Sequence, residues 1–345
     1  MSELVFDGES LITPEAIAGE FASSGAKIHG SEFATGKAHL AVILNIAKER
    51  FERGTRVANT VRGLSVELHK TRRRFHPDIW QALIPIAQNH PVSQYFHQDP
   101  FTRWSFEKPR GYSGDAHLLD FIYGHSSVAA EIENTTPLGQ TVYECGTSAA
   151  SSVAVRERRD LLTQHVDEIA TGRGPDAEVL TIAAGHLREA DGSVALSEGR
   201  LKRWVALDQD PLSVGSMIRN FRGTRVDPID GSVRGLLTNA YKLGRFDFVY
   251  SAGLYDYLSR KVAVSLTQRC LQMLKPNGVL LFANFAQDIP DDGYMETFMN
   301  WALLLRSEAD MWDIINASVD RNAVEAQVHF GANRNIVYGI IRKRA

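Results

Sequence analysis

The sequence predicts an α/β protein in which a doubly wound sheet follows an N-terminal helical region. Two observations support this fold. An apolar run at residues 179–183 leads into a cluster of small residues around Gly185, where a main chain can turn sharply. A second apolar run at residues 204–208 ends in Asp208. A tight turn after one parallel strand and an acid at the end of the next strand are how a doubly wound sheet holds an adenosine ribose.

Helices are expected throughout residues 1–140, because no alternating strand pattern stands out there. Residues 39–70 place apolar side chains at helical spacing, with a break near Gly54, and residues 78–88 form a shorter amphipathic helix. Aromatic and charged side chains then concentrate around residues 108–115. We therefore expect residues 1–140 to form an all-helical domain.

The rest of the chain, residues 141–345, alternates helices and strands. A long helix over residues 142–170 precedes the first strand, and helical segments separate the strands that follow. Parallel strands need such crossovers, so this part is predicted to be a doubly wound domain. The last two β-rich runs are predicted to form a terminal hairpin that adds an antiparallel strand. Strands are expected at residues 179–183, 204–208, 224–229, 246–251, 278–285, 323–330 and 335–342, and helices at 211–220 and 263–274.

Composition limits the classes of function. The 345 residues include 38 basic and 41 acidic side chains, a net charge of −3, so no basic excess suggests nucleic-acid binding. Cys145 and Cys270 lie far apart, which disfavours a disulfide framework or a zinc site and fits a reducing cytoplasm. No export-signal pattern stands out, and no apolar run approaches the roughly 18 residues of a membrane span. We expect a cytoplasmic globular protein that acts on a small molecule.

The turn around Gly185 departs from the dinucleotide-binding pattern. A dinucleotide binder carries Gly-x-Gly-x-x-Gly, whereas only Gly185 is present here. The missing glycines disfavour a pyrophosphate on a helix N-terminus, and with it a nicotinamide dehydrogenase. A cofactor without phosphates makes no such demand.

Further motifs follow in the order known from one superfamily. An Asp-Gly-Ser turn at residues 230–232 follows the third strand, and Leu-Lys-Pro-Asn-Gly at residues 274–278 enters the fifth. Together with Gly185 and Asp208, this order resembles the class I S-adenosylmethionine (SAM) dependent methyltransferases over about residues 142–345. The resemblance implies a Rossmann-like sheet of seven strands with the last strand antiparallel, and SAM as the cofactor.

A finer resemblance rests on three segments. Lys-Pro-Arg-Gly-Tyr-Ser-Gly-Asp at residues 108–115, Ser-Ala-Gly-Leu-Tyr-Asp-Tyr-Leu at residues 251–258 and Asn-Phe at residues 284–285 resemble one bacterial branch of these enzymes. That branch is named after biosynthesis of the extracellular factor 3-hydroxypalmitate methyl ester. The segments are also similar to those of the azetidine-2-carboxylate synthases, which keep this fold but cyclise SAM itself.

The resemblance implies roles at the ends of the strands. Asp208 is expected to accept hydrogen bonds from both ribose hydroxyls, although an acid at this position also caps helices. Ala183 and Leu187 stand where many methyltransferases have glycines, and Thr181 replaces a common aspartate, so the site for the methionine end departs from the usual pattern. Asp230 and Ser232 are expected at the adenine edge, and residues 251–253 beneath the sulfonium. The expected cofactor-binding residues are Ala183, Gly185, Asp208, Gln209, Asp230, Gly231, Ser232, Ser251, Ala252 and Gly253.

The sulfonium of SAM sets the catalytic task. An enzyme must place a nucleophile in line with the breaking C–S bond, at roughly 3–3.5 Å, and exclude water. Aromatic faces stabilise a sulfonium through cation–π attraction, so we expect residues 108–115 to form a lid. Arg110 is expected to clamp a carboxylate and Tyr112 to face the sulfonium or the acceptor, with Asp115 and Tyr255 as further catalytic candidates. The alternatives are an Arg110–Asp115 pair that pins a loop and Tyr255 as a core aromatic.

Two reactions fit this chemistry. In one, a carboxylate, oxygen or nitrogen of a small-molecule acceptor from secondary metabolism or signalling attacks the methyl carbon and leaves S-adenosylhomocysteine. In the other, the methionine amine attacks its own γ-carbon, which forms azetidine-2-carboxylate and releases methylthioadenosine. The frequency of each reaction in the superfamily favours methyl transfer. A SAM-binding scaffold without catalysis is the alternative of another class, and the retention of Asp208 and of the lid motif argues against it.

Overall fold

The computed structural model describes residues 30–54 and 56–344, which form two compact units. The sheet unit comprises Ala154–Gln287 and the chain from Leu303 onward. The helical unit comprises the described chain up to Val153 and, in addition, Asp288–Ala302. The described chain therefore passes between the two units three times, and the units do not divide at the predicted position between residues 140 and 141.

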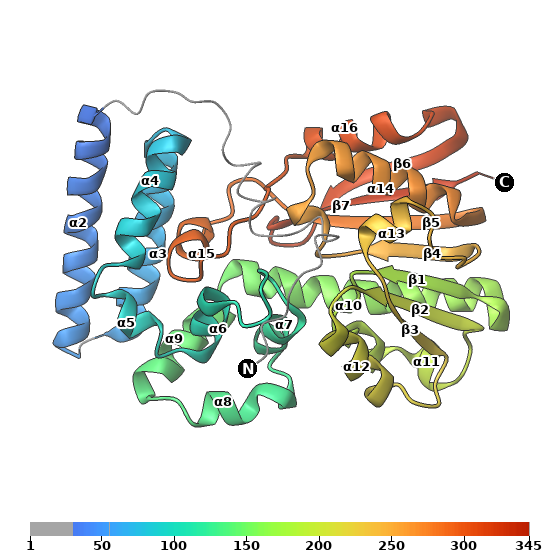
Figure 1. Cartoon of the computed structure of the whole chain (residues 1–345), viewed down its shortest axis with the longest axis horizontal. Helices are drawn as coiled ribbons and strands as arrows, with labels where there is room; N and C mark the ends of the chain where they lie inside the picture. The colour runs from blue at the N-terminus through green and yellow to red at the C-terminus, as the bar shows by residue number, and fades with distance from the viewer. Residues whose placement is uncertain (1–29, 55, 345) are drawn as a thin grey trace. The chain divides into compact units, whose positions relative to one another are not determined.

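The sheet unit is built on seven strands in the order β3-β2-β1-β4-β5-β7-β6 (Figure 1). Strands β1 to β5 pair in parallel, whereas β7 is antiparallel to both β5 and β6. This confirms the predicted Rossmann-like sheet with its terminal hairpin. The strands are β1 (Glu178–Ile182), β2 (Arg203–Asp208), β3 (Val226–Asp230), β4 (Phe246–Ser251), β5 (Leu274–Phe285), β6 (Val324–Phe330) and β7 (Ile336–Lys343).

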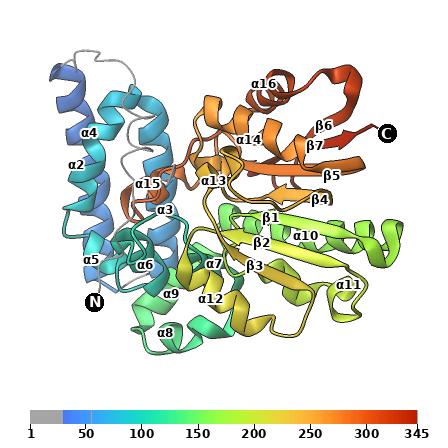
Figure 2. The ribbon, with the colours of Figure 1, turned by 45° about the vertical axis from the view of Figure 1, so that its right-hand side comes forward.

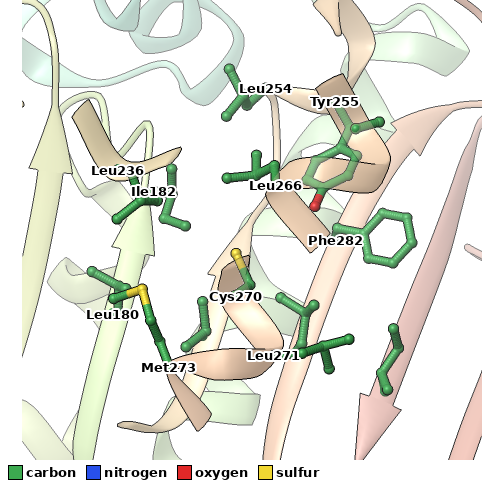
Figure 3. Close-up of a cluster of buried hydrophobic side chains, with 14 of the residues drawn as sticks. Leu180, Ile182, Leu236, Leu254, Tyr255, Leu266, Cys270, Leu271, Met273 and Phe282 are labelled. Atoms are coloured by element: carbon green, nitrogen blue, oxygen red, sulfur yellow. The ribbon is translucent and has the colours of Figure 1, made fainter. Parts of the chain in front are cut away.

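Helices cover both faces of this sheet (Figures 1 and 2). Helices α13, α14 and α16 cover one face and bury an apolar cluster that includes Leu180, Leu266 and Phe282 (Figure 3). Helix α10 covers the other face, where the His165 ring lies 5.9 Å from the Phe248 ring. The α-helices that include sheet-unit residues are α10 (Ala150–Arg173), α11 (Val194–Ser197), α12 (Pro211–Asn220), α13 (Val233–Leu237), α14 (Arg260–Gln272) and α16 (Glu308–Ser318).

This two-sided cover explains the apolar runs in the sequence. Every residue of β1 and of β4 is buried, as expected for central parallel strands with helices on both faces. Strand β3 lies at the edge of the sheet and is only partly buried, which is why its sequence pattern is the weakest of the parallel strands.

The helical unit contains no strand within the described residues. The predicted break near Gly54, whose φ is 64°, separates its first two described helices. The prediction of a single helix over residues 142–170 was wrong, because the chain breaks between α9 and α10, where the Ser148 hydroxyl donates to the Cys145 carbonyl. None of the helices in the described part of the chain is long and apolar enough to cross a bilayer. The α-helices of this unit are α2 (Gly30–Glu52), α3 (Val57–Arg74), α4 (Pro77–Gln88), α5 (Ser93–Phe96), α6 (Pro100–Glu107), α7 (Ala116–Tyr123), α8 (Ala129–Glu133), α9 (Pro137–Thr147) and α15 (Asp292–Thr297).

Helix α15 joins the helical unit through buried charges. Arg72 of α3 lies between two carboxylates of α15, with Nη1 at 3.0 Å from Asp292 Oδ2 and Nη2 at 3.1 Å from Glu296 Oε1. His69 Nδ1 lies 2.8 Å from Asp292 Oδ1, and the Trp80 indole N–H donates to Glu296. Both carboxylates are buried, and their paired partners come from α3 and α4. A segment from the C-terminal half of the sequence is thus fastened to the N-terminal helices.

Candidate functional site

The turn after β1 has an unusual backbone. Ala183, Gly185 and Leu187 all adopt left-handed conformations, with φ of 56°, 57° and 53°. This conformation costs a residue with a side chain about 1–2 kcal/mol of free energy, whereas glycine adopts it readily. Ala183 and Leu187 therefore keep the backbone shape that glycines give at these positions. The alanine and the leucine thus lie at positions whose backbone conformation favours glycine.

Asp208 ends β2 directly beside this turn. The Gly185 N–H donates to its Oδ2 at 2.6 Å, and the Asp210 N–H donates to its Oδ1 at 2.8 Å. The predicted proximity of the Gly185 turn and Asp208 is present in the structure. The two amides orient the carboxylate and leave lone pairs on both oxygens for further donors. Burial raises the pKa of Asp208 to about 6, and the two amide donors oppose that rise.

The loop after β3 lies beside the same strand end. Asp230 pairs in register with Asp208 and is exposed, so its carboxylate is accessible at the end of β3. The Gly231 N–H donates to the Asp208 carbonyl at 2.9 Å, which connects the ends of β2 and β3. Ser232 caps helix α13 with its hydroxyl, and its N–H donates to the Tyr241 hydroxyl at 2.9 Å. The structure thus gives Ser232 a helix-capping role in addition to the cofactor role expected from the sequence, while Gln209 follows Asp208 at the end of β2.

The end of β4 provides the small residues of the expected site. The Ser251 hydroxyl donates to the Ile182 carbonyl at 3.1 Å, which connects the ends of β4 and β1. The Ala252 carbonyl accepts a hydrogen bond from Arg158 Nη1 at 2.6 Å. Gly253 lies beside the same guanidinium, because a Cβ at this position would come within 3.8 Å of Arg158 Nη2. The ends of β1, β2 and β4 are therefore connected through backbone and side-chain hydrogen bonds.

Tyr255 lies in the core of the sheet unit, and its expected catalytic role was wrong. Its side chain is fully buried, and its hydroxyl lies 2.9 Å from the Thr267 hydroxyl. Its ring stacks on Phe282 with 4.6 Å between the ring centres (Figure 3). A side chain enclosed in this way has no face for a substrate, so the alternative of a core aromatic describes it.

Sequence reasoning missed a buried polar cluster at the ends of β4 and β5. Arg306 donates to the Tyr255 and Leu258 carbonyls and to the Asn284 side chain. The Phe285 N–H donates to Asp256 Oδ1 at 2.6 Å. Burial raises the pKa of Asp256 to about 7. The signal for this cluster was present, because five of its residues lie in the segments 251–258 and 284–285 that carry the family resemblance.

The 108–115 segment belongs to the helical unit. Asp115 caps helix α7 by accepting from the Leu118 N–H at 2.9 Å, and it accepts from the Trp104 indole N–H at 2.9 Å. Arg110 Nε lies 3.9 Å from Asp115 Oδ1, and the Asp115 side chain is 2% exposed. These contacts give Asp115 the loop-pinning role that was the alternative to catalysis.

Two glycines shape the same segment. Gly111 and Gly114 have φ of 81° and 73°, so the tight turn expected at these positions is present. Tyr112 lies between them and is partly buried. Its role toward a ligand, like that of Arg110, stays a prediction.

Comparisons with known proteins support the fold. Neither a known family profile nor a curated protein matches the sequence. A crystal structure of a possible exported protein from Bordetella parapertussis has a similar fold, with a TM-score of 0.57 at 17% identity over 85% of this chain and 99% of that chain. Two methyltransferases show weaker similarity. NodS from Bradyrhizobium japonicum WM9, in complex with S-adenosyl-L-homocysteine, has a TM-score of 0.40 at 18% identity over 66% of this chain and 100% of that chain. The plantazolicin methyltransferase BamL has a TM-score of 0.43 at 10% identity over 71% and 99%.

Proposed function

We propose that the sheet unit binds SAM at the carboxyl ends of its parallel strands and transfers the methyl group to a small-molecule acceptor. The observation that carries this proposal is the geometry of Asp208. Two backbone amides hold its carboxylate beside the left-handed turn, and it forms no ion pair within the described chain. A carboxylate that is oriented but keeps open lone pairs suits the two neighbouring hydroxyls of a ribose.

The chain after the turn supports a cofactor without a pyrophosphate. Dinucleotide-binding folds place the pyrophosphate at the N-terminus of a helix that begins at this turn. Here the turn is followed by the five-residue 3-10 helix η3 (Arg188–Gly192) and then by the four-residue helix α11. Helices this short provide little dipole for a phosphate. A nicotinamide dinucleotide is therefore a poorer fit than SAM.

The residues of this site have separate tasks in the proposed reaction. Bound SAM supplies an electrophilic methyl carbon on a sulfonium, so the protein has only to position the reactants and exclude water. Asp208 binds the ribose, and Asp230 is placed for the exocyclic amine of adenine. The small residues Ala252 and Gly253 leave space beside the end of β4 for the sulfonium. Arg110 and Tyr112 of the 108–115 segment are proposed to form the lid.

The products of an incubation with SAM test this proposal. Purified protein is incubated with SAM alone, and then with SAM and a panel of small carboxylic acids and amines, and products are identified by mass spectrometry. We expect S-adenosylhomocysteine only when an acceptor is present. Formation of methylthioadenosine and azetidine-2-carboxylate from SAM alone would contradict methyl transfer and would support cyclisation. Binding of SAM without any product would favour a non-catalytic scaffold.

A further inference from the structure

Strand β6 forms one edge of the sheet, and β7 is its one neighbour among the described strands (Figure 1). The Gly331 N–H donates to the Ile336 carbonyl, and the two strands stay in one register over the whole of β6. In an antiparallel ladder, alternate residues direct both main-chain groups toward the neighbouring strand. The odd-numbered residues of β6 therefore bond to β7, and the even-numbered residues direct their N–H and C=O groups outward.

These outward main-chain groups have no partner in the part of the chain that the structure describes. Beyond the pairing of β6 with β7, no hydrogen bond of the described chain involves the residues that carry them. Their side chains lie on one face of the strand and pack against the apolar cluster of the sheet unit. The four residues are Val324, Ala326, Val328 and Phe330. A row of unpaired donors and acceptors is a template for a further strand.

The opposite edge of the sheet is protected against such pairing. Strand β3 carries Pro228 at its centre, which has no N–H for a further strand, and the exposed Asp227 beside it. Proteins use proline and charge to keep edge strands from pairing. Strand β6 contains neither proline nor lysine, and it has seven residues against the five of β3. The edge at β6 is thus the one that can accept a partner strand.

We propose that β6 is the interface of a homodimer, in which two copies of this strand pair antiparallel about a two-fold axis at Gln327. A two-fold axis pairs each residue with the one equally far on its other side. Val324 then faces Phe330 of the second copy. Ala326 faces Val328 in the same way. Every outward group has a partner in this register, which gives about eight main-chain hydrogen bonds, and a typical interface has about ten.

The exposed side chains of β6 are complementary in the same register. Glu325 lies opposite His329 of the second copy, on both sides of the axis, in a pair without main-chain hydrogen bonds, where side chains approach most closely. The carboxylate can accept from an imidazole N–H, and such cross-strand pairs stabilise a sheet. With the axis moved to Ala326, Glu325 would instead face Gln327, and Phe330 would extend beyond the partner strand. The side chains therefore favour the axis at Gln327.

This interface goes beyond the proposed function and does not depend on it. Four strands separate β6 from β2, which ends in Asp208. The two edges that meet would join two seven-stranded sheets into one continuous sheet. The partner that fits this surface is thus a second copy of the chain.

Two cysteine variants on the exposed face of β6 test the register. Residues that face each other across the axis have about 4.5 Å between their Cα atoms, which is within disulfide reach. Gln327→Cys places two thiols at the axis, so mild oxidation should convert most of the protein to a covalent dimer on a non-reducing gel. Glu325→Cys is the matched control, because Glu325 is exposed on the same strand but lies more than about 13 Å from its own copy. It should crosslink at least about tenfold less.

Sedimentation velocity of the full chain measures the association itself. We expect the wild type to sediment at twice the mass of one chain at micromolar concentrations. Ala326→Pro removes an outward N–H from each copy and leaves the pairing with β7 intact, so the Kd of the dimer should rise by about 10- to 100-fold. Thermal unfolding shows whether this variant is folded.

Three results would overturn the proposal. One is a wild-type mass of a single chain at concentrations up to about 100 μM. Another is equal crosslinking of Gln327→Cys and Glu325→Cys, or a dimer that Gln327→Cys does not crosslink, because either result assigns the contact to another surface. The third is a folded Ala326→Pro variant that associates as the wild type does. The cysteine variants keep the test valid if Ala326→Pro does not fold, since both change exposed side chains.

Discussion

Three buried carboxylates, two in the helical unit and one in the sheet unit, differ in how they are satisfied. In the helical unit, Asp292 and Glu296 are paired with Arg72, His69 and the Trp80 indole. In the sheet unit, Asp208 is held by two backbone amides and has no cationic partner within the described chain.

This difference agrees with the proposal that Asp208 binds a ligand, whereas Asp292 and Glu296 hold the fold together. The charges of Asp292 and Glu296 are balanced by the cation of Arg72, which belongs to the fold itself. Two backbone amides orient the Asp208 carboxylate, and this carboxylate can still accept further hydrogen bonds. Asp208 therefore differs in its partners from Asp292 and Glu296, although all three residues are buried.

Removal of Arg72 should have the largest effect. Arg72→Met leaves two buried carboxylates without their main cation, so we expect the free energy of unfolding to fall by about 3–5 kcal/mol. Urea denaturation measures this change. Arg73→Met is the control on the next residue, because Arg73 pairs with Asp288 on the surface, where both side chains are more than half exposed. It should cost less than about 1 kcal/mol. Equal losses in the two variants would contradict a structural role for the buried cluster.

Removal of the Asp208 carboxylate should weaken binding instead of folding. We expect Asp208→Ala to weaken SAM binding by about 1–3 kcal/mol, because two charge-assisted hydrogen bonds to the ribose are lost. Calorimetry measures the affinity, and thermal unfolding checks that the variant is folded. Asp227→Ala, at an exposed position in the neighbouring strand β3, is the control and should bind as the wild type does. Unchanged affinity in Asp208→Ala would mean that the ribose lies elsewhere.

The pH dependence of binding should report on the same carboxylate. The pKa of Asp208 is raised to about 6, so its acceptor oxygens are ionised above pH 6 and protonated below it. We expect the affinity for methylthioadenosine to be constant from pH 7 to pH 8 and to fall by up to about tenfold per pH unit below pH 6. This ligand lacks an amino-acid end, so its affinity reports on the adenosine part of the site. In Asp208→Asn the affinity should no longer change with pH. If it still does, another group is responsible for the pH dependence.

The raised pKa of Asp208 also affects the stability of the folded protein, and here a higher pH is unfavourable, whereas it favours ligand binding. Because the folded value lies above the ordinary value of 3.8, the folded protein binds the proton more tightly than the unfolded chain does. Ionised Asp208 therefore lowers stability as the pH rises through 6. A ligand that binds the carboxylate opposes this loss. Under the proposed function, the site thus loses stability in exchange for the capacity to bind a ligand.

A change in the left-handed turn should have the smallest effect. Ala183→Gly removes the strain of a side chain at φ 56°, so we expect a gain in stability of about 0.5–1 kcal/mol, measured by thermal unfolding. The neighbouring Ala184 does not have a positive φ, so Ala184→Gly should reduce stability by a similar amount. A loss of stability in Ala183→Gly would show that the methyl group makes a contact worth more than the strain.

The parts of the molecule that follow local patterns were predictable from the sequence. The strands were found because buried parallel strands are apolar runs, and the contact of Gly185 with Asp208 follows from two neighbouring strands joined by a crossover. The contact of Arg72 with Glu296 joins residues 224 positions apart without any periodic pattern, so nothing in the sequence pointed to it. Arg158 was missed for a related reason. A single charged residue within a helix is usually solvated, and only the packed structure shows that this one is buried.

The three passages of the chain between the units restrict how this protein can be recombined. A break after Val153 removes most helices of the helical unit but leaves α15, within Asp288–Ala302, on the other fragment. A chimera with a single junction would then join α3 and α15 from different parents, and Arg72 would meet acids that were not selected with it. The helical unit is therefore not a contiguous cassette. An exchange of this unit between related proteins must include both the N-terminal helices and Asp288–Ala302. Two distant parts of the gene are therefore expected to be inherited together.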